Sequence, residues 1–217
     1  DNDIGLNQLN GKELSYNNYG DIFSSLLISK SLPKNVGTVI VKHSNPCGVS
    51  VNRDHKKSYN LALSSDPISA FGGVVCCNFK INLSIAKELY KSFYEVVIGN
   101  GIEKKALKIL KKRKNLRVID SSKLNINYLE SIIFNNNNFL VQNTDNIKFP
   151  LNNFKVVSKR KPSAKMMNNL ISTFNICRFV KSNGIVISNG DSTIGIGSGQ
   201  PSRLDSCKIA IEKMKKF

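Results

Sequence analysis

The feature that most constrains the fold is an alternation of short apolar runs with helical patterns. Runs of strand length recur at residues 36–41, 73–79, 94–98, 116–119, 139–142, 154–158 and 184–188. Between several of them, at 83–93 and 163–180, apolar side chains repeat at the spacing of one helix face. Continuous apolar runs are typical of strands buried on both faces, so the alternation predicts an α/β fold.

Two further signals refine this prediction. Asn189-Gly190, between two apolar runs, is a hairpin signal, so at least one strand pair is antiparallel and the sheet is expected to be mixed. The Asn-rich residues 133–139 and the polar residues 143–153 are expected to be loops. They place a boundary near residue 145, between a first sub-domain at 1–145 and a second at 146–217. No internal repeat is present.

Composition excludes several classes of protein. No run approaches the ~18 apolar residues that a membrane helix needs, and the first residues lack the order of a signal peptide. We therefore expect a cytoplasmic protein with no membrane contact. The five cysteines form an odd set without a CxxC motif, which indicates reduced thiols, with Cys76 and Cys77 as small buried residues.

A net charge of +17 favours anionic partners such as phosphates, nucleotides or nucleic acid. The densest lysine run, at 104–115, has the spacing of a helix with a solvated basic face. A basic RNA-binding protein is therefore the alternative function. It needs exposed aromatic side chains for base stacking, whereas Phe93 and Tyr94 fall at apolar helix and strand positions. We expect no nucleic-acid partner.

The stretch KHSNPCG, at residues 42–48, contains the first candidate site. Lys42 and His43 follow an apolar strand, and Pro46 and Gly48 are expected to turn the chain there. Strand ends of α/β sheets form ligand clefts, and a cationic neighbour favours the neutral imidazole that a general base requires. The alternative is a surface strand end with an idle histidine. We interpret His55 as a residue of a polar loop.

Two glycine-containing stretches are further candidates. In SSDPISAFGGVV, at residues 64–75, Phe71 either stacks on a heteroaromatic ligand or packs in the core, and Gly72 permits close approach. In GIGSGQPSR, at 195–203, glycines, a helix start and Arg203 suit an anion, and the alternative is a plain turn. Asn183 either caps backbone groups or offers its amide to a substrate carboxamide.

A zinc deaminase site is excluded by sequence. That site needs H-x-E (or C-x-E) and a Pro-Cys-x-x-Cys motif. Here Asn45 stands two residues after His43, and no second cysteine follows Cys47 at that spacing. We therefore expect no zinc.

Seven segments in order resemble the AICAR transformylase domain of the AICAR transformylase/IMP cyclohydrolase family. They are GKELSYNN (11–18), KHSNPCGV (42–49), DPISAFGGVV (66–75), EVVIGNG (95–101), LVQNTD (140–145), KSNGIV (181–186) and GIGSGQPSRLDS (195–206). The resemblance covers nearly the whole chain. It implies a cytidine-deaminase-like α/β/α arrangement, duplicated and without zinc.

The resemblance also implies an activity. Family members transfer a formyl group from 10-formyltetrahydrofolate to the 5-amino group of AICAR, and their cyclohydrolase domain closes the product to IMP in purine biosynthesis. Lys42 and His43 match the catalytic Lys-His pair, with His43 as the base. Asn183 matches the asparagine at the carboxamide and reacting centre.

Further matches concern substrate binding. Arg203 matches an arginine near the nucleotide, Phe71 and Gly72 match residues lining the nucleotide and folate site, and Glu95 matches an acidic ribose contact. Ser182 matches one contact of a potassium site in some members. Val180 stands where that site needs a hydroxyl residue, which argues against potassium.

Departures from the family pattern predict a fragment. The cyclohydrolase domain, the Arg-Tyr-Gly segment that precedes GKELSYNN, and the downstream Asp-Ala-Phe-Phe-Pro-Phe stretch are not in this sequence. Because the family's transformylase site lies at a dimer interface, the resemblance implies a homodimer.

Overall fold

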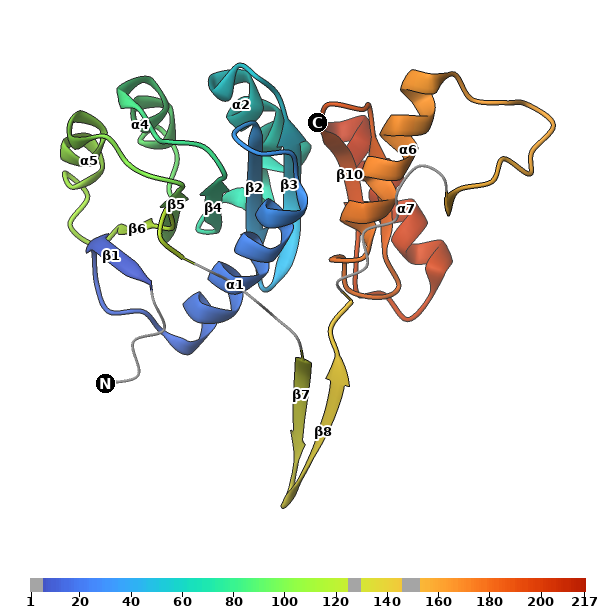
Figure 1. Cartoon of the computed structure of the whole chain (residues 1–217), viewed down its shortest axis with the longest axis horizontal. Coiled ribbons are helices and arrows are strands. Elements are labelled where there is room, and N and C mark those ends of the chain that lie inside the picture. The colour runs from blue at the N-terminus through green and yellow to red at the C-terminus, as the bar shows by residue number, and fades with distance from the viewer. Residues whose placement is uncertain (1–5, 125–129, 146–152) are drawn as a thin grey trace.

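A computed structural model of the chain describes residues 6–124, 130–145 and 153–217. Figure 1 shows a sheet flanked by helices, a hairpin that projects from it, and a C-terminal group of elements at its side. The helices are α1 Tyr16–Ser31, α2 His55–Ser65, α3 Pro67–Ala70, α4 Leu83–Leu89, α5 Lys104–Leu110, α6 Ala164–Cys177 and α7 Arg203–Lys216. The strands are β1 Asn7–Asn10, β2 Gly37–Lys42, β3 Asn45–Val51, β4 Val74–Cys77, β5 Val96–Gly99, β6 Arg117–Asp120, β7 Glu130–Asn135, β8 Asn138–Asn143, β9 Ile185–Ser188 and β10 Thr193–Gly197.

The main sheet has six strands in the order β1-β6-β5-β4-β2-β3. Strands β4, β5 and β6 are parallel, whereas β2 is antiparallel to both β3 and β4, and β1 is antiparallel to β6. The prediction of an α/β fold with a mixed sheet is confirmed. Because β2 runs against β4, the carboxyl end of β2 and the amino end of β4 meet at one edge, where Val41 pairs with Val74.

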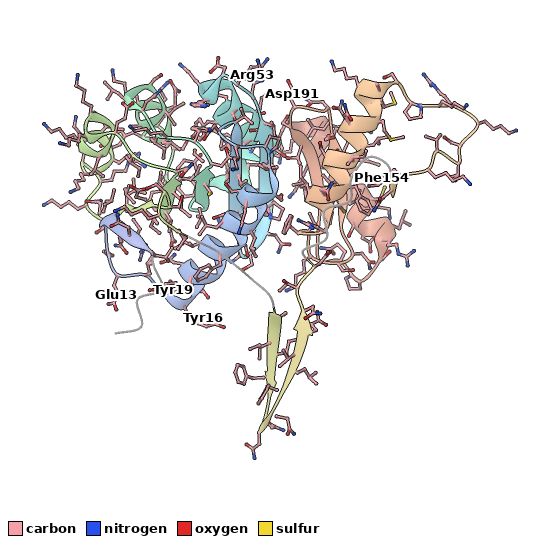
Figure 2. All side chains as sticks on the ribbon, viewed as in Figure 1. Glu13, Tyr16, Tyr19, Arg53, Phe154 and Asp191 are labelled. Carbon is pink, nitrogen blue, oxygen red and sulfur yellow. The ribbon has the colours of Figure 1, made fainter. Side chains whose placement is uncertain are left out.

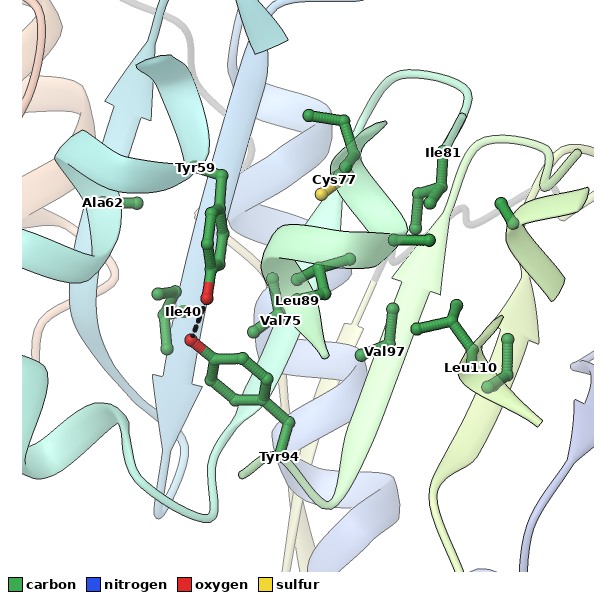
Figure 3. Close-up of a cluster of buried hydrophobic side chains, with 14 of the residues drawn as sticks. Ile40, Tyr59, Ala62, Val75, Cys77, Ile81, Leu89, Tyr94, Val97 and Leu110 are labelled. Carbon is green, nitrogen blue, oxygen red and sulfur yellow. Dashed lines mark hydrogen bonds between the residues drawn. The ribbon is translucent and has the colours of Figure 1, made fainter. Parts of the chain in front are cut away.

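Apolar side chains cover both faces of this sheet, as continuous apolar strands require. On one face, Ile22, Leu26 and Ile28 of α1 pack on the sheet. On the other face, α2, α4 and α5 contribute a second cluster, part of which Figure 3 shows. There the buried hydroxyls of Tyr59 and Tyr94 are 2.8 Å apart and satisfy each other by a hydrogen bond (Figure 3).

The C-terminal unit, defined here as α6, β9, β10 and α7, has its own antiparallel pair, β9-β10. This pair confirms the antiparallel pairing predicted around Asn189-Gly190. The unit contacts β3 of the main sheet directly. Val51 donates its backbone N–H to the carbonyl of Asp191 (2.7 Å; Asp191 is labelled in Figure 2), and Val49 donates to the Thr193 hydroxyl (2.9 Å). The division at residue 145 stays a prediction.

Several local predictions are wrong. Residues 133–139, expected to be a loop, form the end of β7, the turn and the start of β8 in the β7-β8 hairpin, with Asn136 at φ 50° in the turn. Residues 154–158, expected to be a strand, belong to no strand. Part of the expected loop at 143–153 lies outside the described residues. The predicted helix at 83–93 ends at Leu89, so Phe93 lies beyond it and is about half exposed.

The cysteine and lysine-helix predictions are confirmed. Cys76 and Cys77 are buried in β4, and all five cysteines are free thiols. Residues 104–110 of the lysine run form α5, with Ala106 and Leu110 buried, whereas residues 111–115 lie in turns beyond the helix. Within the part of the chain that the structure describes, no helix combines the length and the apolar character needed to cross a membrane.

Candidate functional site

Lys42 and His43 lie at the end of β2, where a two-residue turn leads into β3. Lys42 pairs with Asn45 across the hairpin, so His43 and Ser44 are the central residues of the turn. Both have positive φ, 52° and 59°, as a type I′ turn requires. The expected turn at Asn-Pro-Cys-Gly is wrong, because these residues begin β3. Proline is tolerated there because β3 is an edge strand of the sheet.

The His43 turn is held from outside the hairpin. The Asp21 carboxylate, on α1, accepts hydrogen bonds from the backbone N–H of Ser44 (2.6 Å) and of His43 (3.3 Å). The His43 side chain is exposed, and its imidazole has no hydrogen-bond partner among the described residues. The turn therefore fixes the backbone at His43 and leaves its ring nitrogens available.

Lys42 and the Phe71-Gly72 segment meet at the same edge. The Lys42 ammonium donates to the Phe71 carbonyl (2.7 Å), and a Cβ atom on Gly72, whose φ is 72°, would lie 4.0 Å from the Lys42 Nζ atom. Phe71 is 63% exposed, and its ring lies 5.1 Å from the Phe93 ring, centroid to centroid. Phe71 is thus not a core residue, and the two rings form an exposed aromatic surface beside the lysine.

The buried carboxylate of Asp66 positions this segment. It caps α3 by accepting from the Ser69 N–H (2.9 Å), and its other oxygen is 2.7 Å from the Lys213 Nζ atom of α7. Asp66 is only 3% exposed. Burial pushes its pKa up, but the hydrogen bonds from Lys213 and Ser69 outweigh burial and hold the pKa below its usual value. Asp66 is therefore a structural anion at neutral pH.

Glu95, the residue before β5, lies at the same edge. Its backbone N–H donates to the Gly73 carbonyl (3.1 Å), which places it next to the Phe71-Gly72 segment. Its carboxylate accepts from the buried Asn18 amide (2.9 Å) and lies 3.9 Å from Arg117. One carboxylate oxygen thus contacts both Asn18 and Arg117, and the Glu95 side chain is about half exposed.

Asn183 lies in a loop bonded to the GSGQP turn. Its amide donates to the carbonyls of Gln200 (3.0 Å) and Pro201 (2.9 Å), and the Lys181 carbonyl accepts from the Gly199 N–H (2.8 Å). The alternative role of capping backbone groups is therefore realised. The Asn183 side-chain oxygen makes no hydrogen bond within the described ranges, so it can still accept one from a carboxamide.

Asn45 connects the two halves of the site. Its amide donates to the His43 carbonyl (3.1 Å), and its oxygen accepts from the Lys181 N–H (3.1 Å). One side chain thus joins the Lys42-His43 turn to the loop that contains Asn183. Asn45 and Asp21 were not among the predicted site residues. The available signals were a glycine, Gly20, inside a helix and an asparagine two residues after His43.

The structure brings only part of the predicted set into direct contact. Lys42, Phe71 and Gly72 touch, with Glu95 beside them, and Asn183 is linked through Asn45. Arg203 is exposed at the first residue of α7, where it makes no ion pair or hydrogen bond to any described residue. His55 is not in a polar loop as expected. It begins α2, stacks on Phe79 with 3.8 Å between ring centroids, and contacts the Asn35 carbonyl through Nε2 (2.8 Å).

Metal binding, and nucleophilic chemistry at the buried thiols of Cys47 and Cys76, receive no support from the described side chains. Within residues 6–124, 130–145 and 153–217, no three His, Cys, Asp or Glu residues lie close enough to hold a metal ion. Burial, and secondarily the Asp66 carboxylate, raise the pKa of Cys47 to about 12, and burial raises that of Cys76 to about 11. These two groups stay protonated at neutral pH and are poor nucleophiles.

Comparison with known proteins identifies the family. The model of the AICARFT/IMPCHase bienzyme family matches residues 2–213. The bifunctional purine biosynthesis protein PurH of Aquifex aeolicus (strain VF5) is 38% identical over 218 residues, 99% of this chain and 42% of that protein. PurH of Buchnera aphidicola subsp. Schizaphis graminum (strain Sg) is 42% identical over 96% of this chain and 40% of its own length.

PurH of Bacillus cereus (strain AH187) is 39% identical over 94% of this chain and 40% of that protein. The chain thus spans about two-fifths of the length of the curated relatives it matches. The match covers nearly all of the chain. The chain belongs to the AICARFT/IMPCHase bienzyme family.

Proposed function

We propose that the full-length gene product is a phosphoribosylaminoimidazolecarboxamide (AICAR) formyltransferase of purine biosynthesis that uses 10-formyltetrahydrofolate. The observation that carries the proposal is the edge where Lys42, the exposed His43 imidazole and the Phe71-Gly72 segment gather, in a chain whose residues 2–213 match this family. We propose that the same product has the IMP cyclohydrolase activity that its family's description names.

The reaction joins the AICAR amine nitrogen to the formyl carbon and breaks the bond from that carbon to N10 of the folate. The amine loses a proton, and the leaving N10 gains one. His43 accepts the amine proton, because its ring nitrogens are exposed on a fixed turn. Lys42 uses one ammonium hydrogen on the Phe71 carbonyl, so its other two can stabilise the developing formyl oxyanion.

Substrate binding follows from the surrounding groups. The exposed rings of Phe71 and Phe93 suit stacking on a flat heteroaromatic such as the pterin or the imidazole. The free Asn183 oxygen suits the carboxamide NH2, Glu95 suits a ribose hydroxyl, and Arg203 suits the phosphate.

The test compares the two histidines of the chain. In the full-length gene product, His43→Ala should lower formyl transfer to AICAR by about 100-fold or more, the usual range for a general base, while AICAR binding by calorimetry is retained. His55→Gln is the matched control, because His55 packs on Phe79, and its turnover should stay close to wild type. Unchanged turnover in His43→Ala would contradict the assignment.

We also propose that the site is completed in a homodimer. The β7-β8 hairpin exposes a row of large apolar side chains, 47% to 80% accessible, which soluble proteins normally cover with a partner. They are Ile132, Ile133, Phe134, Phe139, Leu140 and Val141. Light scattering should give twice the monomer mass, and Phe134→Asp should weaken the dimer. A monomer at micromolar concentration would refute this proposal.

A further inference from the structure

The His43-Ser44 turn has a conformation that is unfavourable at Ser44. Type I′ turns require positive φ at both central positions and are dominated by Asn, Asp and Gly. Histidine is enriched at positive φ among residues other than glycine, whereas serine is not and carries a Cβ that crowds the backbone there. Such strained residues persist only where the surrounding structure determines them. The support must therefore come from neighbouring elements.

Helix α1 supplies this support through Asp21. Its two carboxylate oxygens each accept one backbone N–H of the turn, at 2.6 Å from Ser44 and 3.3 Å from His43. Gly20 lets the helix come close, since a Cβ on that residue would lie 3.3 Å from the Ser44 Oγ atom. A glycine inside a helix is unfavourable, so close approach is its structural reason.

We propose that Asp21 is a positioning residue that holds the His43-Ser44 turn in its left-handed conformation and thereby sets the direction of the His43 imidazole. The effect on catalysis rests on the proposed formyl transfer, whereas the effect on the imidazole does not. Asp21 acts through the turn and touches no reacting atom. Losing it lets the turn relax toward negative φ and moves the base away from the substrate amine.

The test uses Asp21→Ala in the full-length gene product, with two readouts. Turnover should fall about 10- to 100-fold, as expected for a misplaced catalytic group, while KM for AICAR changes little because binding groups are intact. In 1H–13C spectra of the imidazoles, the His43 signals should shift or broaden, and those of His55 should not, because His55 is fixed by Phe79 and Asn35.

A matched control separates positioning from general stability. Asp54 is also a carboxylate that accepts two backbone N–H groups, those of Lys56 and Lys57, but at the start of α2. Asp54→Ala should lower the melting temperature without changing turnover or the His43 signals.

The decisive variant adds Ser44→Gly to Asp21→Ala. Glycine adopts positive φ without strain, so the double variant should recover most of the turnover and the wild-type His43 signals. The proposal would be overturned if the double variant recovered neither the turnover nor the His43 signals. It would also be overturned if Asp21→Ala changed neither of them. If wild type itself transfers no formyl group, the proposed function falls, and the imidazole spectra alone decide the role of Asp21.

Discussion

The two long hairpins, β2-β3 and β7-β8, both have two-residue turns but lie in opposite surroundings. Each closes with a two-residue turn that uses positive φ, at His43 and Ser44 in the first and at Asn136 in the second. Asparagine tolerates this conformation by itself. Serine is not favoured there, and the Asp21 carboxylate holds the His43-Ser44 turn by two hydrogen bonds. Beneath its turn, β2-β3 is almost entirely buried, whereas β8 is exposed along its whole length.

The difference shows what a fold must provide to place a catalytic side chain on a turn. A catalytic residue in a turn of unfavourable conformation needs hydrogen bonds from another element, and the buried strands on either side fix its position. A turn residue that favours its own conformation, such as Asn136, needs no such hydrogen bonds and no buried strands. Tyr16, at the start of α1 and labelled in Figure 2, is 91% exposed, whereas α1 contributes to the site through Asn18, which donates to Glu95, and through Asp21.

The largest expected difference between the two hairpins is in the stability lost when an isoleucine is truncated. Ile40 of β2 is fully buried and Ile133 of β7 is mostly exposed. Ile40→Ala should lower the free energy of unfolding by about 2–5 kcal/mol, because it removes packed methyl groups and leaves a cavity. Ile133→Ala should change it by no more than about 0.5 kcal/mol. Urea unfolding measures both, and equal losses would show that the second hairpin is buried in solution.

Low pH should weaken the ion pair between Asp66 and Lys213, which holds the segment that leads to Phe71 and Gly72. Because the pKa of Asp66 is lowered in the fold, its ion pair with Lys213 contributes stability above the unfolded pKa of about 3.9 and loses it as pH falls below that value. Asp66→Asn should cost about 1–3 kcal/mol at pH 7. The cost should shrink progressively as the pH falls below about 3.9, because the unfolded chain is then protonated and the stability from the folded ion pair is lost as the pH falls through the lowered pKa of Asp66. A pH-independent cost would contradict the ion-pair account.

Turn conformation gives a smaller contrast. Ser44→Gly should stabilise the protein by about 1 kcal/mol, because glycine removes the cost of positive φ. Asn136→Gly should have an effect below about 0.5 kcal/mol, because asparagine already tolerates the conformation. Thermal unfolding of the two variants side by side provides the measurement. A larger gain at Asn136 would reverse the proposed distinction.

The smallest expected effect is on the rate at which a thiol reagent modifies Cys47, which depends on how often the β2-β3 hairpin opens. Its thiol is buried in β3, with a pKa raised to about 12, whereas Cys207 on α7 is half-buried. A thiol reagent at neutral pH should modify Cys207 first and Cys47 only when the hairpin opens. Both should react rapidly in denaturant, and equal rates in buffer would mean that β3 is not protected.

Local sequence predicted the main sheet well because its strands are continuous apolar runs. Local composition gave the wrong prediction for β3, because Asn45-Pro46-Cys47-Gly48 has the composition of a turn. The proline is acceptable in this strand because β3 lies at the edge of the sheet. Local composition also misled at 133–139, where the asparagines that suggested a loop are divided between the two strands β7 and β8 and the turn that joins them. In both cases, pairing partners decided the structure.

Candidate residues from motifs were easier to find than the residues that position them. Lys42, Phe71 and Gly72 lie together at the sheet edge, as a strand-end cleft requires. Asp21 and Asn45 act by hydrogen bonds to backbone groups far along the chain, at separations of 22 and 136 residues. Such contacts follow from how a helix and a loop pack, which no local pattern encodes.

The central claim is that the turn presents His43 to the substrate amine. A crystal structure of the full-length gene product with AICAR bound tests it most directly. We expect an imidazole nitrogen of His43 at about 2.6–3.2 Å from the 5-amino nitrogen, with Asp21 still hydrogen-bonded to the turn. An AICAR molecule bound with its amine beyond reach of both His43 and a bridging water would contradict it.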